Sequence, residues 1–334
     1  MMNRNEFFNY IAENVQMYLP SSFEDAQVLI EESIKENGRK VPALLIIRQG
    51  DSSIPRIPLE EIYSDYMAGN SLNACVRKAA DLRVAFDNSE CLSDLGYVKD
   101  YEKIKDKLMI KLCDPELNQE WLNDKVYTLH GDFAAVYYVK IFENEEQTFS
   151  MPVSKQLMGD WKVTIKQIHE DALLSERAKQ AFLFEIDDYI CWITTGNGII
   201  RNLLDGKTEW HPEIAETPML CLTNSSMKNG ASMILQEDLM KQVGEIIGSD
   251  FYVLPSSIHE TLLVPIGIMD GSGLFQMVKD VNETEVDISD QLSNKVQYYD
   301  RAKGIFENAE RRNQATSFII MNGEFYMGQG PAAA

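Results

Sequence analysis

The stretch Phe251–Pro265, FYVLPSSIHETLLVP, holds two short apolar runs on either side of a Pro-Ser-Ser turn. FYVL has the aromatic and β-branched content of a buried strand, Pro255 ends it, and IHETLLV is predicted to continue as a second strand. Upstream, MLCLTN at 219–224 predicts another strand, and SMILQEDLMKQVGEII at 232–247 predicts a helix that ends at Gly248. The sequence therefore predicts a β-α-β-β unit in the C-terminal half.

Outside this unit the apolar spacing also alternates between helical and extended patterns. Helices are expected at 6–19, 59–69, 71–86 with Ser71 as N-cap, 164–183 with Thr164 and Gln167 as a capping box, and 273–282. Strands are expected at 41–48, 133–142 and 148–153, a terminal hairpin at 317–328, and either a strand or a helix at 24–36. These segments predict an α+β fold with a mixed or mainly antiparallel sheet and packed helices.

The domain organisation is expected to comprise an N-terminal α+β region at 1–147 and a C-terminal α+β region at 148–326, which contains the β-α-β-β unit. Residues 327–334 read as a disordered tail, because GQGPAAA is of low complexity. A chain of 334 residues is long enough for two domains.

The charge balance limits the expected partners. Lys and Arg number 31 against 52 Asp and Glu, which gives a net charge of −21. Such a surface repels nucleic-acid phosphates and anionic lipids, so direct nucleic-acid binding and membrane association are not expected. Five cysteines without a Cys-x-x-Cys pair, and an N-terminus without an apolar signal core, predict a soluble cytoplasmic protein.

Several longer strings resemble a known bacterial family. They are LPSSIHETLLVP at 254–265, VNETEVDISDQLSNKVQYYDRAKG at 281–304, MPVSKQLMGDWKVTIKQI at 151–168, IPRIPLEEIYSDYMAGNSL at 54–72, and HGDF at 130–133. The chain resembles the bacterial domain-of-unknown-function family 5688, and it is more distantly similar to the YtpQ-like family. The resemblance supports the fold of the C-terminal unit and implies no reaction.

Ser257 and His259 are the candidate catalytic residues. If 257–264 is a strand, both side chains lie on one face and Glu260 lies on the other. A serine nucleophile needs a base that an acid orients and an oxyanion hole, and neither the orienting acid nor a Gly-x-Ser-x-Gly elbow occurs here. We therefore interpret Pro-Ser-Ser as a bend held by hydroxyl-to-backbone hydrogen bonds, with His259 as a polar residue at a sheet edge.

The remaining polar candidates are weaker. The four histidines, at 130, 169, 211 and 259, form no His-Glu-x-x-His, so no metal site and no cofactor are predicted. Asn224 lies in a turn before a helix, where backbone N–H groups can meet an anion, although helix capping is the simpler interpretation. Asn224, Ser256, Glu260 and His130 are the candidate binding residues.

The functional prediction follows from the absence of a complete catalytic motif. We expect a non-enzymatic binding or accessory protein whose partner is another protein. The main alternative is a hydrolase-like enzyme that uses Ser257 and His259. A second alternative is an acidic inhibitor that mimics nucleic acid, which the net charge of −21 suggests.

Overall fold

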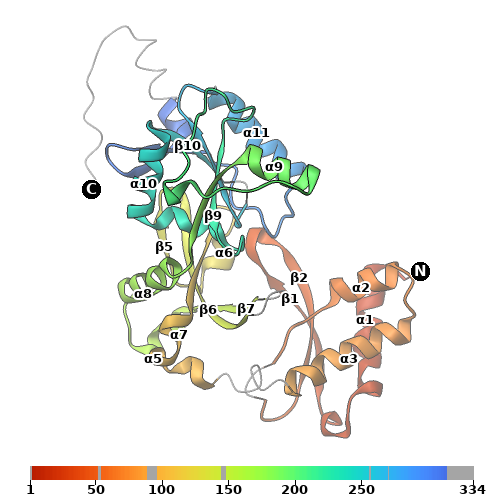
Figure 1. Ribbon diagram of the computed structural model, residues 1–334. Helices are drawn as coiled ribbons and strands as arrows, with labels where there is room; N and C mark the ends of the chain where they lie inside the picture. The colour runs from red at the N-terminus through yellow and green to blue at the C-terminus, as the bar shows by residue number, and fades with distance from the viewer. Residues whose placement is uncertain are drawn as a thin grey trace. The chain divides into compact units, whose positions relative to one another are not determined.

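The chain is represented by a computed structural model that describes residues 2–51, 54–88, 96–143, 148–255, 257–269 and 271–313. It forms two compact units, and each unit draws on three separate segments of the sequence. Unit 1 comprises residues 1–107, 117–125 and 139–163, and unit 2 comprises residues 108–116, 126–138 and 164–334 (Figure 1). The sequence predicts two domains that meet between residues 147 and 148, and this boundary stays a prediction.

The predicted α+β class is confirmed, because both units combine helices with antiparallel strands. Every described strand pair whose register is known runs antiparallel. The elements of unit 1 are α1 (Arg4–Asn14), β1 (Gln27–Ile34), β2 (Lys40–Ile47), β3 (Ile57–Pro58), α2 (Leu59–Met67), α3 (Leu72–Asn88), α5 (Tyr101–Ile104), α6 (Gln119–Leu122), β7 (Thr148–Pro152) and α7 (Lys155–Trp161).

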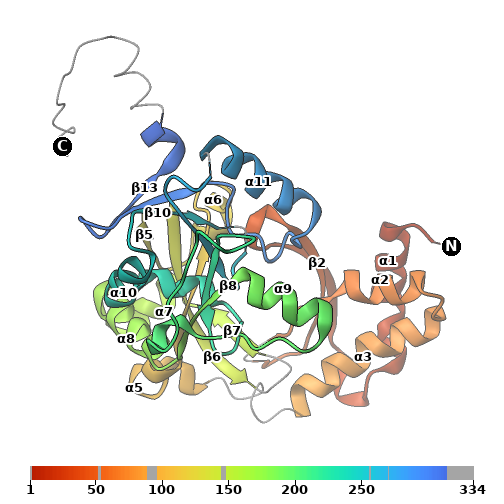
Figure 2. The same ribbon diagram turned by 45° about the horizontal axis from the view of Figure 1, so that its top comes forward.

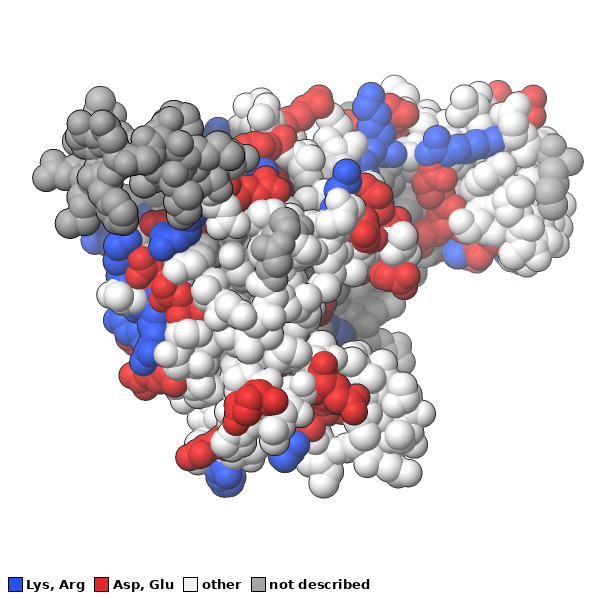
Figure 3. Space-filling view, turned by 90° about the horizontal axis from the view of Figure 1, so that it is seen from above, with Lys and Arg blue, Asp and Glu red and all other residues white. Residues whose placement is uncertain are grey.

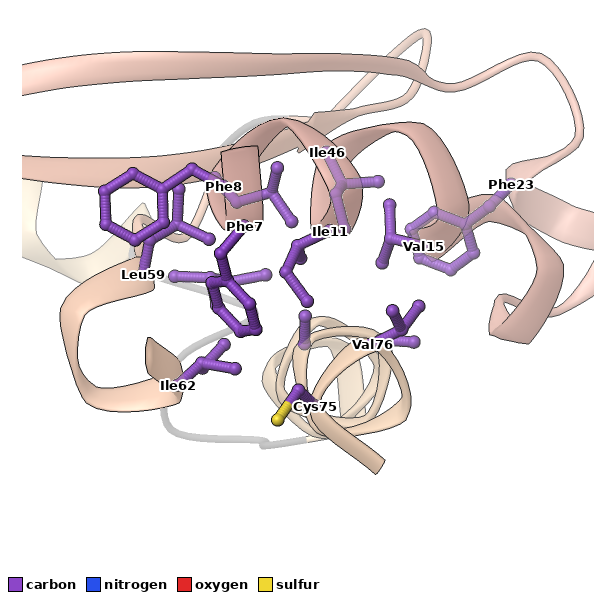
Figure 4. Packing of buried hydrophobic residues seen from close by; sticks show 14 residues of the cluster. Phe7, Phe8, Ile11, Val15, Phe23, Ile46, Leu59, Ile62, Cys75 and Val76 are labelled. Atoms are coloured by element: carbon purple, nitrogen blue, oxygen red, sulfur yellow. The ribbon is translucent and has the colours of Figure 1, made fainter. Parts of the chain in front are cut away.

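The core of unit 1 lies between the sheet β1-β2-β3 and the helices α1, α2 and α3. Figure 4 shows Phe7, Phe8 and Ile11 of α1 packed against apolar side chains of β2, α2 and α3. Within the segment 24–36, for which the sequence left strand or helix open, residues 27–34 form strand β1, which pairs with β2 over eight residues. Ser71 accepts a hydrogen bond from the Ala74 N–H at 3.2 Å, which confirms its predicted place at the start of α3.

One arginine is fully buried in unit 1. Arg83 of α3 donates to the Ile46 carbonyl at 3.0 Å and to Asp51 at 2.8 Å, and it also pairs with Asp87. Its guanidinium lies 4.8 Å from the centre of the Phe23 ring. Burial alone raises the pKa of Asp51, but hydrogen bonds from Arg48 and the positive charge of Arg83 lower it below its ordinary value. The buried charge is therefore fully paired.

Unit 2 is built on a six-stranded sheet in the order β13-β12-β10-β11-β9-β8. Tyr252 and Leu254 of β10 pack with Leu274 and Val278 of α11, which lies beside β10 in Figures 1 and 2. The elements of unit 2 are β4 (Leu108–Cys113), β5 (Tyr127–His130), residues 133–138 of β6 (Phe133–Glu143), α8 (Ile165–Arg177), β8 (Ala181–Glu185), α9 (Ile186–Thr195), β9 (Leu220–Asn224), α10 (Glu237–Ile247), β10 (Phe251–Leu254), β11 (Thr261–Pro265), α11 (Gly271–Thr284), β12 (Gln297–Asp300) and β13 (Ile305–Asn308).

A second group of strands in unit 2 has the order β4-β6-β5, and α8 packs against β4 and β5. Glu176 of α8 is fully buried, and its carboxylate accepts from the Ile110 N–H of β4, from Lys179 and from the Ser232 hydroxyl. Ser232 belongs to the 3₁₀ turn Gly230–Leu235 that precedes α10. These bonds fix α8 against β4 and against the start of α10.

The predicted β-α-β-β unit is present as β9, α10, β10 and β11, but its helix begins at Glu237 and not at Ser232, because residues 230–235 form a 3₁₀ turn. The helix predicted to run to residue 183 ends at Arg177, because residues 181–185 pair with β9 as strand β8. The strand predicted at 258–264 begins at Thr261. Helix α9, at 186–195, was not predicted, and the predicted terminal hairpin at 317–328 and tail at 327–334 lie outside the described residues.

Candidate functional site

Ser257 is part of a turn, and its hydroxyl is engaged with the local backbone. Ser257 Oγ accepts from the His259 N–H at 2.9 Å, the hydrogen bond expected when serine shapes a bend. Ser257 also hydrogen-bonds Glu260 and forms an isolated bridge to Gln291. No hydrogen bond joins this hydroxyl to the His259 ring among the described residues. The turn therefore interrupts the strand that the sequence predicts through 257–260.

The His259 ring contacts two loops, one at Asn229 and one at Asp290. Its Nδ1 accepts from the Asn229 N–H at 3.2 Å, so the ring proton is on Nε2, which lies 3.5 Å from Asp290 Oδ1. Its backbone carbonyl accepts from the Gly230 N–H at 2.9 Å and from the Thr223 hydroxyl at 2.8 Å. The imidazole is thus held by an acid from a distant segment, but it does not reach Ser257.

The other candidates near this turn also have local partners. Asn224 is fully buried, its Nδ2 donates to the Lys228 carbonyl, and its Oδ1 accepts from the backbone and the hydroxyl of Ser226. Burial raises the pKa of Glu260, although the hydrogen bond with Ser257 acts in the opposite direction. Ser256 lies outside the described residues. The roles assigned to these residues stay predictions.

His130 belongs to a different site, at the two-residue turn between β5 and β6. His130 pairs with Phe133, and Gly131 adopts a φ of +59° between them. A Cβ at Gly131 would lie 3.2 Å from Gln297 Oε1, so glycine suits both the turn and the close contact. Asp132 accepts from Gln297 and from Asn308, which anchors the turn to β12 and β13.

Four side chains at this site form one hydrogen-bonded chain. The Thr128 hydroxyl lies 3.0 Å from His130 Nε2 and 2.6 Å from the Tyr137 hydroxyl, and Tyr137 in turn lies 2.9 Å from His169 Nδ1. Thr128 and His130 project from one face of β5, Tyr137 lies on the adjacent strand β6, and His169 lies on α8. The two imidazole rings are stacked, with centroids 5.2 Å apart. Tyr137 is fully buried.

Both histidines line a cleft of about 550 Å³, which falls within the range of small-molecule sites. Helices α8 and α10, which supply part of its wall, lie beside β5 in Figures 1 and 2. The wall is partly apolar, from Leu173, Ile234, Leu235, Met240, Ile305 and Phe306. Its charged groups are Arg177 of α8 and Glu237 and Asp238 of α10.

The electrostatics of the cleft favour neutral imidazoles. Burial lowers the pKa of His130, and the neighbouring His169 lowers it further. Burial also lowers the pKa of His169, with a smaller opposing effect from Glu170. The pKa of Tyr137 rises to about 12 because of burial, although its hydrogen bond with Thr128 acts the other way. All three groups are therefore uncharged at neutral pH.

The model of a family of unknown function, DUF5688, matches residues 4–301. The chain belongs to DUF5688. The resemblance to family 5688 is thereby confirmed, whereas the more distant similarity to the YtpQ-like family stays a prediction. His130, His169 and the Ser257 turn lie inside the matched region. No curated protein and no solved structure matches this DUF5688 chain.

Two further features of this DUF5688 protein concern metals and membranes. Among the described residues, no group of three or more His, Cys, Asp or Glu side chains is placed to hold a metal ion. None of the described helices combines the length and the apolar character that crossing a bilayer requires.

Sequence reasoning named His130 but missed the side chains that surround it. Thr128 and His130 are two positions apart in an extended segment, so their side chains share one face. A two-residue turn through Gly131 places β6 beside them, and a contact of Tyr137 with Thr128 could therefore have been predicted from the hairpin pattern. The place of His169 at this site could not be predicted in this way. It reaches the site because the buried Glu176 fixes α8 in place, a long-range contact without a local sequence signal.

Proposed function

We propose that this protein binds a small organic molecule in the cleft at His130 and His169. The observation that supports the proposal is that, in each imidazole ring, only one of the two nitrogens is hydrogen-bonded within the described residues. That nitrogen is bonded to the Thr128–Tyr137 pair, of which Tyr137 is fully buried, and the described residues offer no hydrogen-bond partner to the other nitrogen. A rigidly held polar group with an unused donor or acceptor in a partly apolar cleft is characteristic of ligand sites.

The walls favour a ligand that is small and polar with an apolar portion. The aliphatic and aromatic lining gives area for hydrophobic contact. The Arg177 side chain has no hydrogen-bond or ion-pair partner within the described ranges, whereas Glu237 and Asp238 add negative charge to the lining of the same cleft. Both signs of charge are therefore within reach of one bound molecule.

The proposed role agrees with the non-enzymatic binding or accessory function that the sequence favours. A hydrolase at Ser257 is less well supported, because the serine hydroxyl accepts from the His259 backbone N–H and does not contact the His259 ring. The nucleic-acid mimic requires a continuous carboxylate surface, and on the face seen in Figure 3 Asp and Glu alternate with Lys and Arg. A soluble, cytoplasmic location stays part of this proposal.

The test uses the four histidines as reporters. Protein with ¹⁵N-labelled histidine is titrated with a panel of small amides, carboxylates and amines, and the ring resonances are followed by NMR. We expect at least one compound to shift His130 and His169 saturably while the exposed His211 stays unchanged. His130→Gln should abolish the response at His169, and His211→Gln should leave it intact. A panel that shifts no ring, or shifts His211 equally, contradicts the proposal.

A second candidate function is supported by the surface of α9. No residue of this helix is buried, and Ile190, Trp192 and Ile193 are 43%, 47% and 56% exposed. Ile199 and Ile214, which follow in the chain, are 80% and 79% exposed. Adjacent apolar side chains of this size are typical of protein-binding surfaces. Carboxylates border the helix, at Glu185, Asp187, Asp188, Glu209 and Glu216, so a partner with a basic rim is expected.

This second role is tested with a patch variant, Trp192→Ser with Ile193→Ser, beside the control Leu174→Ser on α8, which is 61% exposed in the native chain. A cellular partner should bind the native chain and the control, and lose the patch variant. The same partner, once purified, should bind more weakly as salt rises. Equal binding by both variants excludes α9 as the contact surface.

A further inference from the structure

The hydrogen-bonded chain His130–Thr128–Tyr137–His169 contains three contacts, and each contact needs one hydrogen. The Thr128–Tyr137 distance of 2.6 Å requires one hydroxyl to donate to the other. Each hydroxyl carries a single hydrogen. Once one of them is used between the two oxygens, only one hydroxyl hydrogen remains for the two histidine contacts, so at most one ring can accept and at least one ring must donate.

Only two arrangements satisfy every group. In the first, His130 Nε2–H donates to Thr128, Thr128 donates to Tyr137, and Tyr137 donates to His169 Nδ1. In the second, every direction is reversed: His169 Nδ1–H donates to Tyr137, Tyr137 to Thr128, and Thr128 to His130 Nε2. Both rings then carry their proton on the same kind of nitrogen, Nε2 in the first arrangement and Nδ1 in the second.

Mixed arrangements are unfavourable for identifiable reasons. If both rings accept, no hydrogen is left between the two oxygens at 2.6 Å. If both rings donate, one hydroxyl hydrogen has no acceptor in the chain, either that of the fully buried Tyr137 or that of the half-buried Thr128. An unsatisfied buried donor is costly, whereas either coherent arrangement has none.

We propose that the two histidines act as one coupled pair, so that the cleft always presents one ring N–H donor and one ring nitrogen acceptor, and selects ligands that carry both an acceptor and a donor, such as a primary amide or a lactam. This inference rests on the proposed function, and it names the ligand class. In the first arrangement His169 Nε2–H is the donor and His130 Nδ1 the acceptor, and in the second these roles are exchanged.

The coupling also allows either orientation of the ligand. Reversal moves three hydrogens within the protein: one leaves a histidine nitrogen for a hydroxyl oxygen, one passes between the hydroxyls, and one leaves a hydroxyl for the other histidine. The other nitrogen of each ring exchanges one hydrogen with solvent or ligand, so the protein's net charge is unchanged. Such networks of polar side chains are worth more than their separate contacts.

The surroundings keep both rings neutral, which the coupling needs. Burial lowers the pKa of both histidines, and the stacked rings, 5.2 Å apart, oppose a double positive charge. The other titratable or charged groups on the cleft wall are Arg177 of α8, Glu237 and Asp238 of α10, and Tyr299 of β12. The three full charges come from α8 and α10, and the two helices contribute opposite signs.

The first test reads the tautomers directly and needs no ligand. In ¹⁵N-histidine protein at pH 7.5, long-range ¹H–¹⁵N correlation spectra distinguish Nε2–H from Nδ1–H. We expect His130 and His169 to show the same tautomer. Thr128→Val removes the link, so His130 should become a mixture of tautomers. His169 should be Nε2–H in this variant whichever arrangement the native protein holds, because Tyr137 can then donate only to its Nδ1. Thr128→Ser restores the hydroxyl and should restore the shared tautomer.

One Nε2–H ring and one Nδ1–H ring in the native protein overturns the inference, as does an unchanged His130 in a folded Thr128→Val variant. If Thr128→Val does not fold, Tyr137→Phe removes the link from the other hydroxyl and serves as the second variant. Histidine shifts in the ¹H–¹³C spectrum confirm folding in each case.

The second test compares acetamide with N,N-dimethylacetamide, which keeps the carbonyl but has no N–H donor. Acetamide should shift both rings together, and dimethylacetamide should bind at least several-fold more weakly. Equal binding of the two overturns the inference about ligand class and leaves the cleft as a ligand site. A shared tautomer without binding of any compound supports the coupling and contradicts the proposed function, so the two failures are distinguishable.

Discussion

Gly230 is the residue at which the loop near His259 tolerates no side chain. A Cβ there would lie 2.1 Å from Thr223 Oγ1, 2.5 Å from the His259 carbonyl oxygen and 2.8 Å from the Asn224 nitrogen. Two of these atoms belong to the backbone, so they cannot rotate away. We expect Gly230→Ala to lower the free energy of unfolding by about 3 kcal/mol, measured by urea denaturation.

The control for this prediction is Gly273→Ala in α11, where a Cβ would meet nothing within 4 Å. That substitution should raise stability by roughly 0.5–1 kcal/mol, because alanine suits a helix better than glycine. If Gly230→Ala does not lower the free energy of unfolding, the close contacts predicted for a Cβ at this position are relieved by movement of the turn, and the prediction is wrong.

The two histidines of the cleft predict a pH dependence of stability. Their pKa values are lowered in the folded protein, so below the ordinary histidine pKa of about 6.5 the unfolded chain binds protons that the folded chain does not. Stability is therefore expected to fall as the pH drops from 7.5 toward 5.5. The double variant His130→Gln with His169→Gln should show a flatter profile in urea denaturation. A native profile that is flat, or that rises toward acid, is the contrary result.

At the scale of single elements, helix α8 positions His169, and its first turn is capped by Thr164. The Thr164 hydroxyl accepts from the Gln167 N–H at 3.2 Å. Thr164→Ala should destabilise the protein by about 1 kcal/mol, because a helix N–H loses its acceptor. Lys166→Ala, in the same turn at an exposed site, should change stability by less than about 0.5 kcal/mol. Equal effects from both changes would show that capping contributes little here.

The elements that the sequence identifies well are those whose periodicity is local and uninterrupted. Apolar spacing located α1, α2, α3 and α10, and the runs at 41–48 and 133–142 located β2 and β6. The stretch 181–185 was wrongly joined to α8 because AFLFE has no local turn signal before it. Its strand state depends on pairing with β9, which lies about forty residues later in the sequence.

The candidate site was predictable only in part, for a related reason. His130 was named because it belongs to the HGDF string that resembles the family, whereas the contact of Tyr137 with His169 joins a strand to a helix that is distant in the sequence. The Ser257–His259 pair, by contrast, was correctly predicted to lie in a bend. The strand predicted through His259 was wrong, because β11 begins at Thr261. Side-chain partners across elements are tertiary information, which residue type and spacing alone do not contain.

At the scale of the whole molecule, the net charge of −21 is the dominant property. Like charges repel in a compact chain, and added salt screens that repulsion more than it weakens the local ion pairs. We therefore expect the midpoint of thermal unfolding to rise between about 0.02 M and 0.5 M NaCl. KCl should act equally, since screening does not depend on the cation. A lower midpoint at high salt would show that ion pairs such as Arg83–Asp51 outweigh the repulsion.

The buried guanidinium of Arg83 has a consequence for how unit 1 assembles. Removing a charge from water is unfavourable until all of its partners are present, and here they come from the loop near residue 23, from strand β2, from residue 51 and from α3 itself. A partly formed unit would hold a desolvated cation with some of these partners missing. These pieces should therefore gain and lose their structure together, in one cooperative step, and amide exchange across them should share a single opening free energy.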